Sequence, residues 1–454
     1  MKLYNTLTRQ VEEIESVEDK KIKMFVCGPT VYDLSHIGHA KTYIQMDVLS
    51  RTLRAQNFDV FYLQNITDID DKIILRAKDK NVSWKDINSK FEDEYYKDMK
   101  ALNNTSVDRY EKATENIDNI KRQVQVLLDK NFAYKIENDG IYFEIAKFKD
   151  YGKLSKRTEL VENDAQSRID QSDKKRGWND FCLWKFSKPG EPVWEADFGK
   201  GRPGWHIEDT AISEKVFGPQ YDIHGGAVDL IFPHHEAEIT QMEAASGKSP
   251  FVRYWVHSGF LNIDGQRMGK SKGNFVTIRE VLKKGYEPMS VRLLMLQSHY
   301  RSSLDFSWDI LDAAQNSYRK IVSWADLRHQ GFSSKDLSND YQTYIEAFEK
   351  SMSSDLKTPE ALAILNKMIK KIDEENAQPD SSAIGKAVEL LDSYLGLRLL
   401  DSSDISSEQK TIIKKREEAR KAKNWAESDR LREELTREGI AVRDTDYGSA
   451  WSRI

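Results

Sequence analysis

The chain has 454 residues, a net charge of −5 and 31% charged residues, which indicates two to four domains with ample core. No apolar run approaches the roughly 18–20 residues that a membrane span needs, and the first residues lack a signal-peptide pattern. Only two cysteines occur, Cys27 and Cys182, so a disulfide framework is excluded and a reducing cytoplasmic setting is expected. The mild acidity does not exclude nucleic acid, because local patches decide that.

Up to about residue 115, strand and helix patterns alternate. An apolar run at 24–26 leads through a Gly-Pro turn to an amphipathic run over 43–53, and a strand at 59–63 precedes another helix. This alternation predicts an α/β fold with a parallel sheet of the Rossmann type.

The middle of the chain interrupts that rhythm. A helix over 117–128, a hairpin over 134–143 and a charged loop over 162–175 are interpreted as an insertion, and a sheet pattern resumes at 221–226. Cys182 lies in an apolar strand pattern and is expected in the core.

The last third of the chain is predicted to be helical. After a polar stretch at 401–407, a helical pattern over 410–437 carries many Lys and Arg residues together with Trp425. Basic residues beside an exposed aromatic suit single-stranded RNA. On composition alone, a solvated charged helix with Trp425 in a local core is favoured over an RNA-binding surface.

The most informative segment is Cys-Gly-Pro-Thr-Val-Tyr-Asp-Leu-Ser-His-Ile-Gly-His, residues 27–39. His36 and His39 lie three apart at a predicted helix start, where their imidazoles share a face and backbone N–H groups favour an anion. Gly38 between them allows close approach of a flat ligand. This chemistry suits the stabilisation of a nucleotide phosphate under attack, although an isolated H-x-x-H is more often a surface cap.

A second motif, Arg-Met-Gly-Lys-Ser-Lys-Gly-Asn, covers residues 267–274. It follows a predicted strand over 255–263 and an Asp-Gly turn. A loop lysine that closes over a triphosphate only in the transition state contributes to rate, and Lys270 is the best candidate. Alone, such a loop is usually just solvated.

Together the two motifs resemble the HIGH and KMSKS signatures of class I aminoacyl-tRNA synthetases. The second departs from the family pattern at Arg267, which keeps the charge of a lysine, and at Gly269, which replaces a serine. Lys270 matches the second lysine of the signature, so activity is expected.

Further strings extend the resemblance, over nearly the whole chain, to the cysteinyl-tRNA synthetase family; they are residues 65–72, 201–208, 224–238 and 254–274. The implied architecture is a Rossmann-type catalytic domain with an insertion, an α-helical bundle and a small anticodon-binding domain. The implied boundaries are 1–115 and 201–265 for the two catalytic halves, 116–200 for the connective insertion, 266–310 for the KMSKS loop and stem-contact region, 311–400 for the bundle and 401–454 for the anticodon-binding domain.

The resemblance implies a zinc ion that binds the substrate thiolate. His234 and Glu238 are four apart, a plausible metal clip, and with Cys27 they match three family ligands. Asp209 stands where the family has a second Cys. Aspartate is a legitimate but harder zinc ligand, so the expected site is Cys27, Asp209, His234 and Glu238, with its zinc occupancy in question.

The same resemblance assigns the remaining contacts. Catalytic residues are His36, His39 and Lys270. ATP contacts are Gly28, Thr30, His36, Gly38, His39, Gly225, Gly226, Asp229 and Lys270, with Mg²⁺ accompanying ATP. Amino-acid contacts are Thr67, Trp205 and His224, where ordinary packing is the alternative for Trp205. The tRNA contacts are Arg420, Trp425, Asp429 and Asp444.

We therefore expect a cytoplasmic, monomeric cysteine–tRNA ligase that forms cysteinyl-adenylate from L-cysteine and ATP and transfers the cysteinyl group to tRNA-Cys. A ligase joining cysteine to a small amine, a non-catalytic RNA-binding paralogue and a simple nucleotidyl transferase are the rivals. The first would lack the C-terminal unit, the second would have lost one signature, and the third needs neither the metal clip nor the helical tail.

Overall fold

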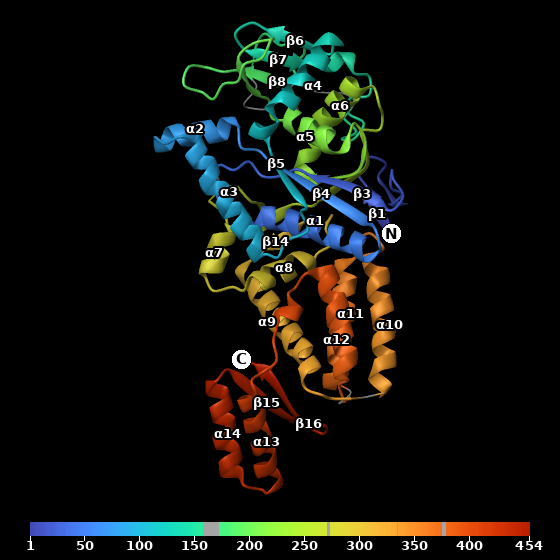
Figure 1. The fold of residues 1–454 in the computed structure, drawn as a ribbon, viewed down its shortest axis with the longest axis vertical. Coiled ribbons are helices and arrows are strands. Elements are labelled where there is room, and N and C mark those ends of the chain that lie inside the picture. Colours follow the sequence, from blue (N-terminus) through green and yellow to red (C-terminus); the bar gives the residue numbers. More distant parts are fainter. Residues whose placement is uncertain (158–171, 270–272, 334, 375–377) are drawn as a thin grey trace. The chain divides into compact units, whose positions relative to one another are not determined.

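A computed structural model describes residues 1–157, 172–269, 273–333, 335–374 and 378–454 (Figure 1). The chain forms two compact units, one made of residues 1–285 and 300–306 and the other of residues 286–299 and 307–454. None of the helices described is long and apolar enough to cross a membrane. The finer division expected from the sequence stays a prediction.

The first unit is built on a five-stranded sheet in the order β11-β10-β3-β4-β5, with every neighbouring pair parallel. Its strands are β3 (Lys21–Val26), β4 (Asp59–Ile66), β5 (Arg109–Lys112), β10 (Tyr221–Ala227) and β11 (Val252–Ser258). The predicted Rossmann-type sheet is thus confirmed. From β3 the chain first adds β4 and β5 on one side and later adds β10 and β11 on the other. The gap between β3 and β10 is therefore a topological switch point, where open α/β sheets bind their ligands.

The first unit contains seven described α-helices. They are α1 (Ile37–Ala55), α2 (Asp71–Lys80), α3 (Trp84–Ala101), α4 (Ile117–Asp129), α5 (Ile207–Phe217), α6 (Glu236–Ser246) and α7 (Ile278–Lys283). Figure 1 shows α1 on one side of the sheet and α5 and α6 on the other. One core cluster joins Ile212 of α5 and Met242 of α6 to Phe25, Leu63 and Trp255 of the sheet, because alternate strand residues face the same side.

A separate antiparallel sheet has the order β6-β7-β8-β9. These strands are β6 (Ala133–Ile136), β7 (Gly140–Phe143), β8 (Phe181–Phe186) and β9 (Gly201–Pro203). The predicted hairpin corresponds to β6 and β7. Cys182 of β8 is buried among Tyr134, Ile136 and Tyr142, as expected for a core residue. Most of the loop predicted over 162–175 lies outside the described residues.

The strand predicted over 255–263 is wrong as one element. It breaks at Gly259, where β11 ends and β12 (Leu261–Ile263) joins a different sheet with β13 (Gln266–Arg267) and β14 (Leu304–Phe306). A Cβ at Gly259 would lie 2.5 Å from the carbonyl oxygens of Arg301 and Ser302, so this close crossing requires glycine. At the start of the chain, β1 (Lys2–Asn5) and β2 (Gln10–Glu13) form a hairpin.

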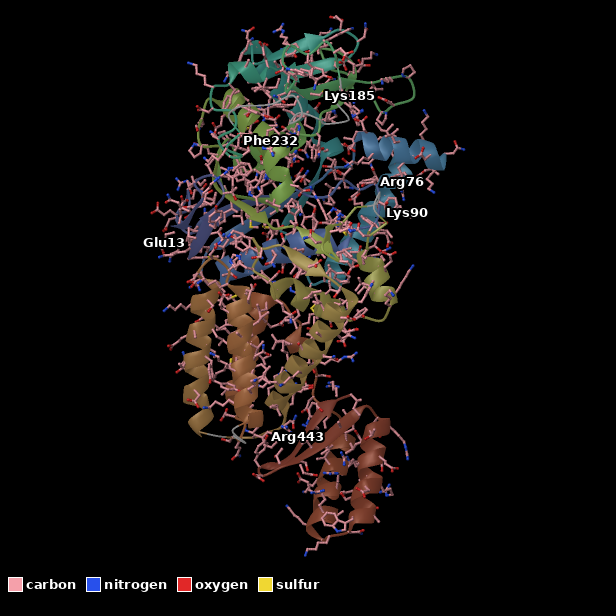
Figure 2. All side chains as sticks on the ribbon, turned by 180° about the vertical axis from the view of Figure 1, so that it is seen from behind. Glu13, Arg76, Lys90, Lys185, Phe232 and Arg443 are labelled. Carbon is pink, nitrogen blue, oxygen red and sulfur yellow. The ribbon has the colours of Figure 1, made fainter. Side chains whose placement is uncertain are left out.

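The second unit is helical, as predicted. It contains α8 (Pro288–Leu296), α9 (Trp308–Ala325), α10 (Lys335–Met352), α11 (Thr358–Glu374), α12 (Ser381–Leu395), α13 (Ser407–Lys421) and α14 (Trp425–Arg437), then β15 (Ile440–Thr445) and β16 (Gly448–Arg453). Arg443, labelled in Figure 2, marks β15. The single helix predicted over 410–437 is two helices, because Lys423 takes a left-handed φ of 57° and the Asn424 side chain caps α14.

Candidate active site

A cavity of about 690 Å³ opens at the carboxyl ends of β3 and β4 in the first unit. It brings together site residues predicted from segments far apart in the chain. The predicted residues that line it are Cys27, Gly28, Thr30, His36, Gly38, His39, Thr67, Trp205, Asp209, Asp229 and His234. Lys270, the predicted loop lysine, lies outside the described residues.

The two signature histidines cap their own helix. His36 is the N-cap of α1, and its Nδ1 accepts from the backbone N–H of His39 at 3.2 Å, while His39 Nδ1 accepts from the backbone N–H of His36 at 3.4 Å. The rings stack with centroids 3.7 Å apart. A neutral imidazole that accepts through Nδ1 carries its proton on Nε2, so each ring can offer one N–H to an anion.

Gly38 holds these rings in place by lacking a side chain. A Cβ there would lie 2.8 Å from His36 Nδ1 and 3.2 Å from Cε of Met268. Met268 belongs to the second motif, so the two motifs meet at this glycine. The backbone adds two links, since Ile37 N donates to Val276 O at 3.1 Å and Ile278 N donates to Ser35 O at 3.0 Å.

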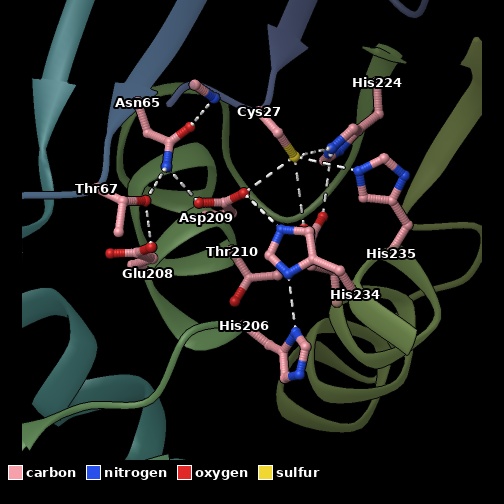
Figure 3. Close-up of polar contacts among 12 residues, drawn as sticks. Cys27, Asn65, Thr67, His206, Glu208, Asp209, Thr210, His224, His234 and His235 are labelled. Carbon is pink, nitrogen blue, oxygen red and sulfur yellow. Dashed lines mark hydrogen bonds and ion pairs between the residues drawn. The ribbon is translucent and has the colours of Figure 1, made fainter. Parts of the chain in front are cut away.

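The four predicted metal ligands are all buried and form a cluster, of which Figure 3 labels Cys27, Asp209 and His234. Cys27 Sγ lies 3.1 Å from Asp209 Oδ2 and 3.8 Å from Glu238 Oε1. His234 Nε2 lies 3.1 Å from the same Asp209 oxygen and 2.8 Å from Glu238 Oε1. The π-helical turn η5 (Ile231–His235) delivers His234 one turn before Glu238 of α6.

The electrostatics of this cluster favour a cation. Burial, followed by the charges of Asp209 and Glu238, raises the pKa of the Cys27 thiol well above its usual range. Burial also raises the pKa of Glu238. The Cys27 thiol and the Glu238 carboxyl therefore retain their protons in this buried site unless a positive charge replaces them. Sulfur, nitrogen and oxygen donors at these separations fit zinc.

A ring of further histidines surrounds the cluster, and sequence reasoning missed most of them. His235 Nε2 lies 3.1 Å from Cys27 Sγ, and Cys27, His234, His235 and Glu238 offer ligand atoms within 4.8 Å of one another. His235 Nδ1 pairs with His257 Nε2 at 2.8 Å, and His206 Nδ1 pairs with His234 Nδ1 at 2.8 Å. For His235 the sequence signal was adjacency, since it follows His234 directly.

The predicted amino-acid residues occupy three different positions. Trp205 stacks on the His234 ring with centroids 4.2 Å apart and is 42% exposed, so it borders the opening. Thr67 lines the cavity and its hydroxyl donates to Glu208 at 2.5 Å. His224 is buried behind the lining, with its Nε2 3.3 Å from Cys27 Sγ.

Two predicted ATP contacts, Gly225 and Gly226, do not line the cavity. A Cβ at Gly225 would lie 2.7 Å from Sδ of Met46, and one at Gly226 would lie 2.8 Å from Cε1 of His235. Their lack of a side chain therefore accommodates neighbouring protein side chains. Asp229 does line the cavity, and Arg267 donates to its carboxylate at 3.0 Å.

The predicted tRNA residues lie in the C-terminal part of the second unit. Trp425 is 56% exposed, with the Arg420 guanidinium 5.6 Å from its ring centroid. Asp444 accepts from both terminal nitrogens of Arg416, at 2.6 and 2.8 Å, and lies 3.1 Å from Arg420. Asp429 is exposed on α14. An aromatic face and a basic group thus lie together at the surface.

Comparison with solved structures identifies the fold. Methionyl-tRNA synthetase from Mycobacterium tuberculosis, bound by methionyl-adenylate, shares the fold with a TM-score of 0.63 at 14% identity, over 86% of this chain and 95% of that one. A putative arginyl-tRNA synthetase from Campylobacter jejuni gives 0.56 at 14% identity, over 85% and 93%. At this identity the two likenesses show the fold that this chain shares with aminoacyl-tRNA synthetases.

Sequence comparison identifies the family. A model for the class I (C) tRNA synthetase catalytic domain matches residues 13–316, a DALR domain matches 347–399, and a cysteinyl-tRNA ligase anticodon-binding domain matches 402–451. Cysteine–tRNA ligases from Thermoplasma acidophilum and Caldicellulosiruptor saccharolyticus are each 42% identical, over 99% and 100% of this chain and 100% of their own length. The chain belongs to the cysteinyl-tRNA synthetase family.

Proposed function

We propose that this protein joins L-cysteine to tRNA-Cys through a cysteinyl-adenylate, with a zinc ion recognising the substrate thiolate. One observation carries the proposal: a single cavity is lined both by the stacked signature histidines and by three of the buried metal-ligand candidates, Cys27, Asp209 and His234. Amino acid and nucleotide would therefore meet in one enclosed space, as adenylate formation requires.

In the first step, the cysteine carboxylate attacks the α-phosphorus of ATP in line, and pyrophosphate leaves. His36 and His39 offer preorganised Nε2–H donors to the phosphate oxygens, whose charge grows in the transition state. Lys270 supplies positive charge to the departing phosphates, a role that rests on its place in the second motif. Asp229 accepts from the ribose hydroxyls, and Gly28 and Thr30 border the phosphate path.

The metal would be held by Cys27, Asp209, His234 and Glu238, and when bound it supplies a soft Lewis acid that favours a thiolate over an alcohol. The chain's own residues prepare that site. Asn65 Nδ2 donates to Asp209 Oδ1 at 2.6 Å, which fixes the carboxylate so that its Oδ2 faces Cys27 and His234. Trp205 and Thr67 then enclose the side chain and the amino end of cysteine.

A metal site within the amino-acid pocket would explain how cysteine is discriminated from serine. The two substrates differ by one atom, and a pocket alone separates such close analogues by roughly 10- to 200-fold. A metal that prefers sulfur extends this ratio without an editing site. In the second step the cysteinyl group passes to the terminal ribose of tRNA. The C-terminal domain binds the tRNA elsewhere, through Trp425, Arg420, Asp429 and Asp444.

ATP–pyrophosphate exchange measured with each of the 20 amino acids, on protein whose zinc content is assayed in the same sample, tests the proposal. Exchange that depends on cysteine, with about one zinc per chain, is expected. Exchange with a different amino acid would refute the substrate, and full cysteine-dependent activity in zinc-free protein would refute the role of the metal.

A further inference from the structure

Lys41 is a buried cation that the proposed mechanism does not use. It lies on α1 two residues after His39, and only 1% of its surface is exposed. Its Nζ donates to the carbonyl oxygens of Gly259 at 2.9 Å and of Tyr300 at 3.1 Å. Within the described part of the chain it has no carboxylate partner, and burial lowers its pKa to about 8. Lysines are rarely buried in this way.

The two carbonyls that receive Lys41 belong to a tight backbone crossing. Gly259 joins β11 to β12, and its own N–H donates to the Tyr300 carbonyl at 2.8 Å. The next residue continues the contact, since Phe260 O accepts from Leu304 N at 2.9 Å. The ammonium of Lys41 therefore lies where the signature helix, the β11–β12 crossing and the segment entering β14 meet.

This crossing forms part of the cavity wall. Gly259, Phe260 and Leu261 line the cavity together with His36 and His39. From Leu261 the chain runs through β12 and β13 directly into the second motif. A shift of the crossing relative to α1 would consequently displace both the wall and the start of the motif loop.

A second, neutral contact ties the same elements together. Thr42 of α1 and Ser258, the last residue of β11, share a hydroxyl hydrogen bond of 2.8 Å. The charged contact is the stronger of the two, because hydrogen bonds from ionised donors exceed neutral ones. The Lys41 ammonium also donates to carbonyl oxygens of two different segments, whereas the Thr42 hydroxyl is hydrogen-bonded to the one side chain of Ser258.

We propose that Lys41 is a positioning residue for the nucleotide half of the reaction: its ammonium holds the β11–β12 crossing against the signature helix, so that the cavity wall and the second motif stay in register with His36 and His39. This inference rests on the proposed function. It assigns to Lys41 an effect on ATP and none on the amino acid, whose site is built by other elements.

Steady-state ATP–pyrophosphate exchange of the full-length protein tests this with Lys41→Met, Lys41→Gln and Lys41→Arg. For the Met and Gln variants we expect KM for ATP to rise about tenfold, the effect of losing charge-assisted hydrogen bonds, with KM for cysteine within about twofold of wild type. Arginine keeps the charge and the donors, so Lys41→Arg should restore most of the ATP affinity. Arg51→Met is the matched control, because Arg51 lies on the same helix but pairs with Asp47 at 2.7 Å, and it should leave KM for ATP unchanged.

An unchanged KM for ATP in folded Lys41→Gln or Lys41→Met protein would overturn the inference. So would an equal loss of all kinetic parameters that Lys41→Arg does not reverse, which is the signature of a purely structural role. If the methionine variant does not fold, the comparison of Gln with Arg decides. Failure of the proposed function is a separate outcome, because it would appear in wild-type protein as exchange that does not require cysteine.

Discussion

Replacing Trp425 by alanine should separate the two steps of the reaction. The indole is 56% exposed at the first position of α14, so its removal should cost little stability, within about 1 kcal/mol. If a tRNA base stacks on it, the loss is about 1–3 kcal/mol, which corresponds to a rise in KM for tRNA of about 5- to 150-fold. The proposed site of adenylate formation lies in the first unit, so the rate of that step should be unchanged.

The assay compares aminoacylation of tRNA-Cys with ATP–pyrophosphate exchange on the same preparations. Trp178→Ala is the matched control, since Trp178 is 58% exposed on the insertion and should change neither reaction. Trp451 gives the opposite control: it is 5% exposed in the core cluster of the C-terminal domain, so Trp451→Ala should cost about 3–5 kcal/mol of stability. Two results would refute the reasoning, an exchange rate that falls as much as aminoacylation and a KM for tRNA that does not rise.

Three further outcomes are expected. If free zinc is kept at 100 times its dissociation constant, the metal stabilises the fold by about 2.7 kcal/mol, so chelation should lower Tm by about 5–10 °C. The Asp209→Cys variant should need a stronger chelator because it adds a thiolate. A calorimetric Tm that chelation does not change would contradict this. Gly38→Ala should slow exchange by about 10²-fold, since its Cβ would lie 2.8 Å from His36 Nδ1; a wild-type rate would show that this ring position is not needed. Burial lowers the pKa of Lys41 from 10.5 to about 8, so between these pH values the unfolded chain binds more protons and the contribution of Lys41 to stability rises with pH. In urea titrations, the free energy of unfolding of wild type relative to that of Lys41→Met should increase by about 2 kcal/mol between pH 7 and 9.5. A difference that stays constant over this range would contradict the assigned shift.

The elements that the sequence predicted well are those with strong local patterns. The apolar run before residue 27, the shared face of His36 and His39 at a helix start, and the pair of His234 and Glu238 each follow from spacing along a strand or a helix. The parallel sheet followed from the alternation of strands and helices in the same way.

What escaped prediction depends on contacts between distant segments. The break at Gly259 has no local signal, because it is imposed by the closeness of Arg301 and Ser302. Gly225 and Gly226 were expected to contact ATP, but only the folded chain reveals that Met46 and His235 fill the space beside them.

The buried histidines illustrate the same limit. His206 precedes α5, His235 ends the turn before α6 and His257 lies on β11, so only the folded chain brings them around Cys27. Sequence offers no means of distinguishing such a ring from ordinary core histidines. Resemblance to a family identifies such a residue only where the residue occupies a motif position whose role in the family is already assigned.

The strand order β11-β10-β3-β4-β5 has a consequence for synthesis of the chain. Strands β3, β4 and β5 are complete once residue 112 has been made, yet β10, the other neighbour of β3, begins only at Tyr221. Until then the growing polypeptide carries its signature helix beside an open edge of β3, and such edges invite pairing with other chains. The residues between 112 and 221 are translated during this interval, so their number sets how long the ribosome-bound half-sheet waits for the strand that covers this edge.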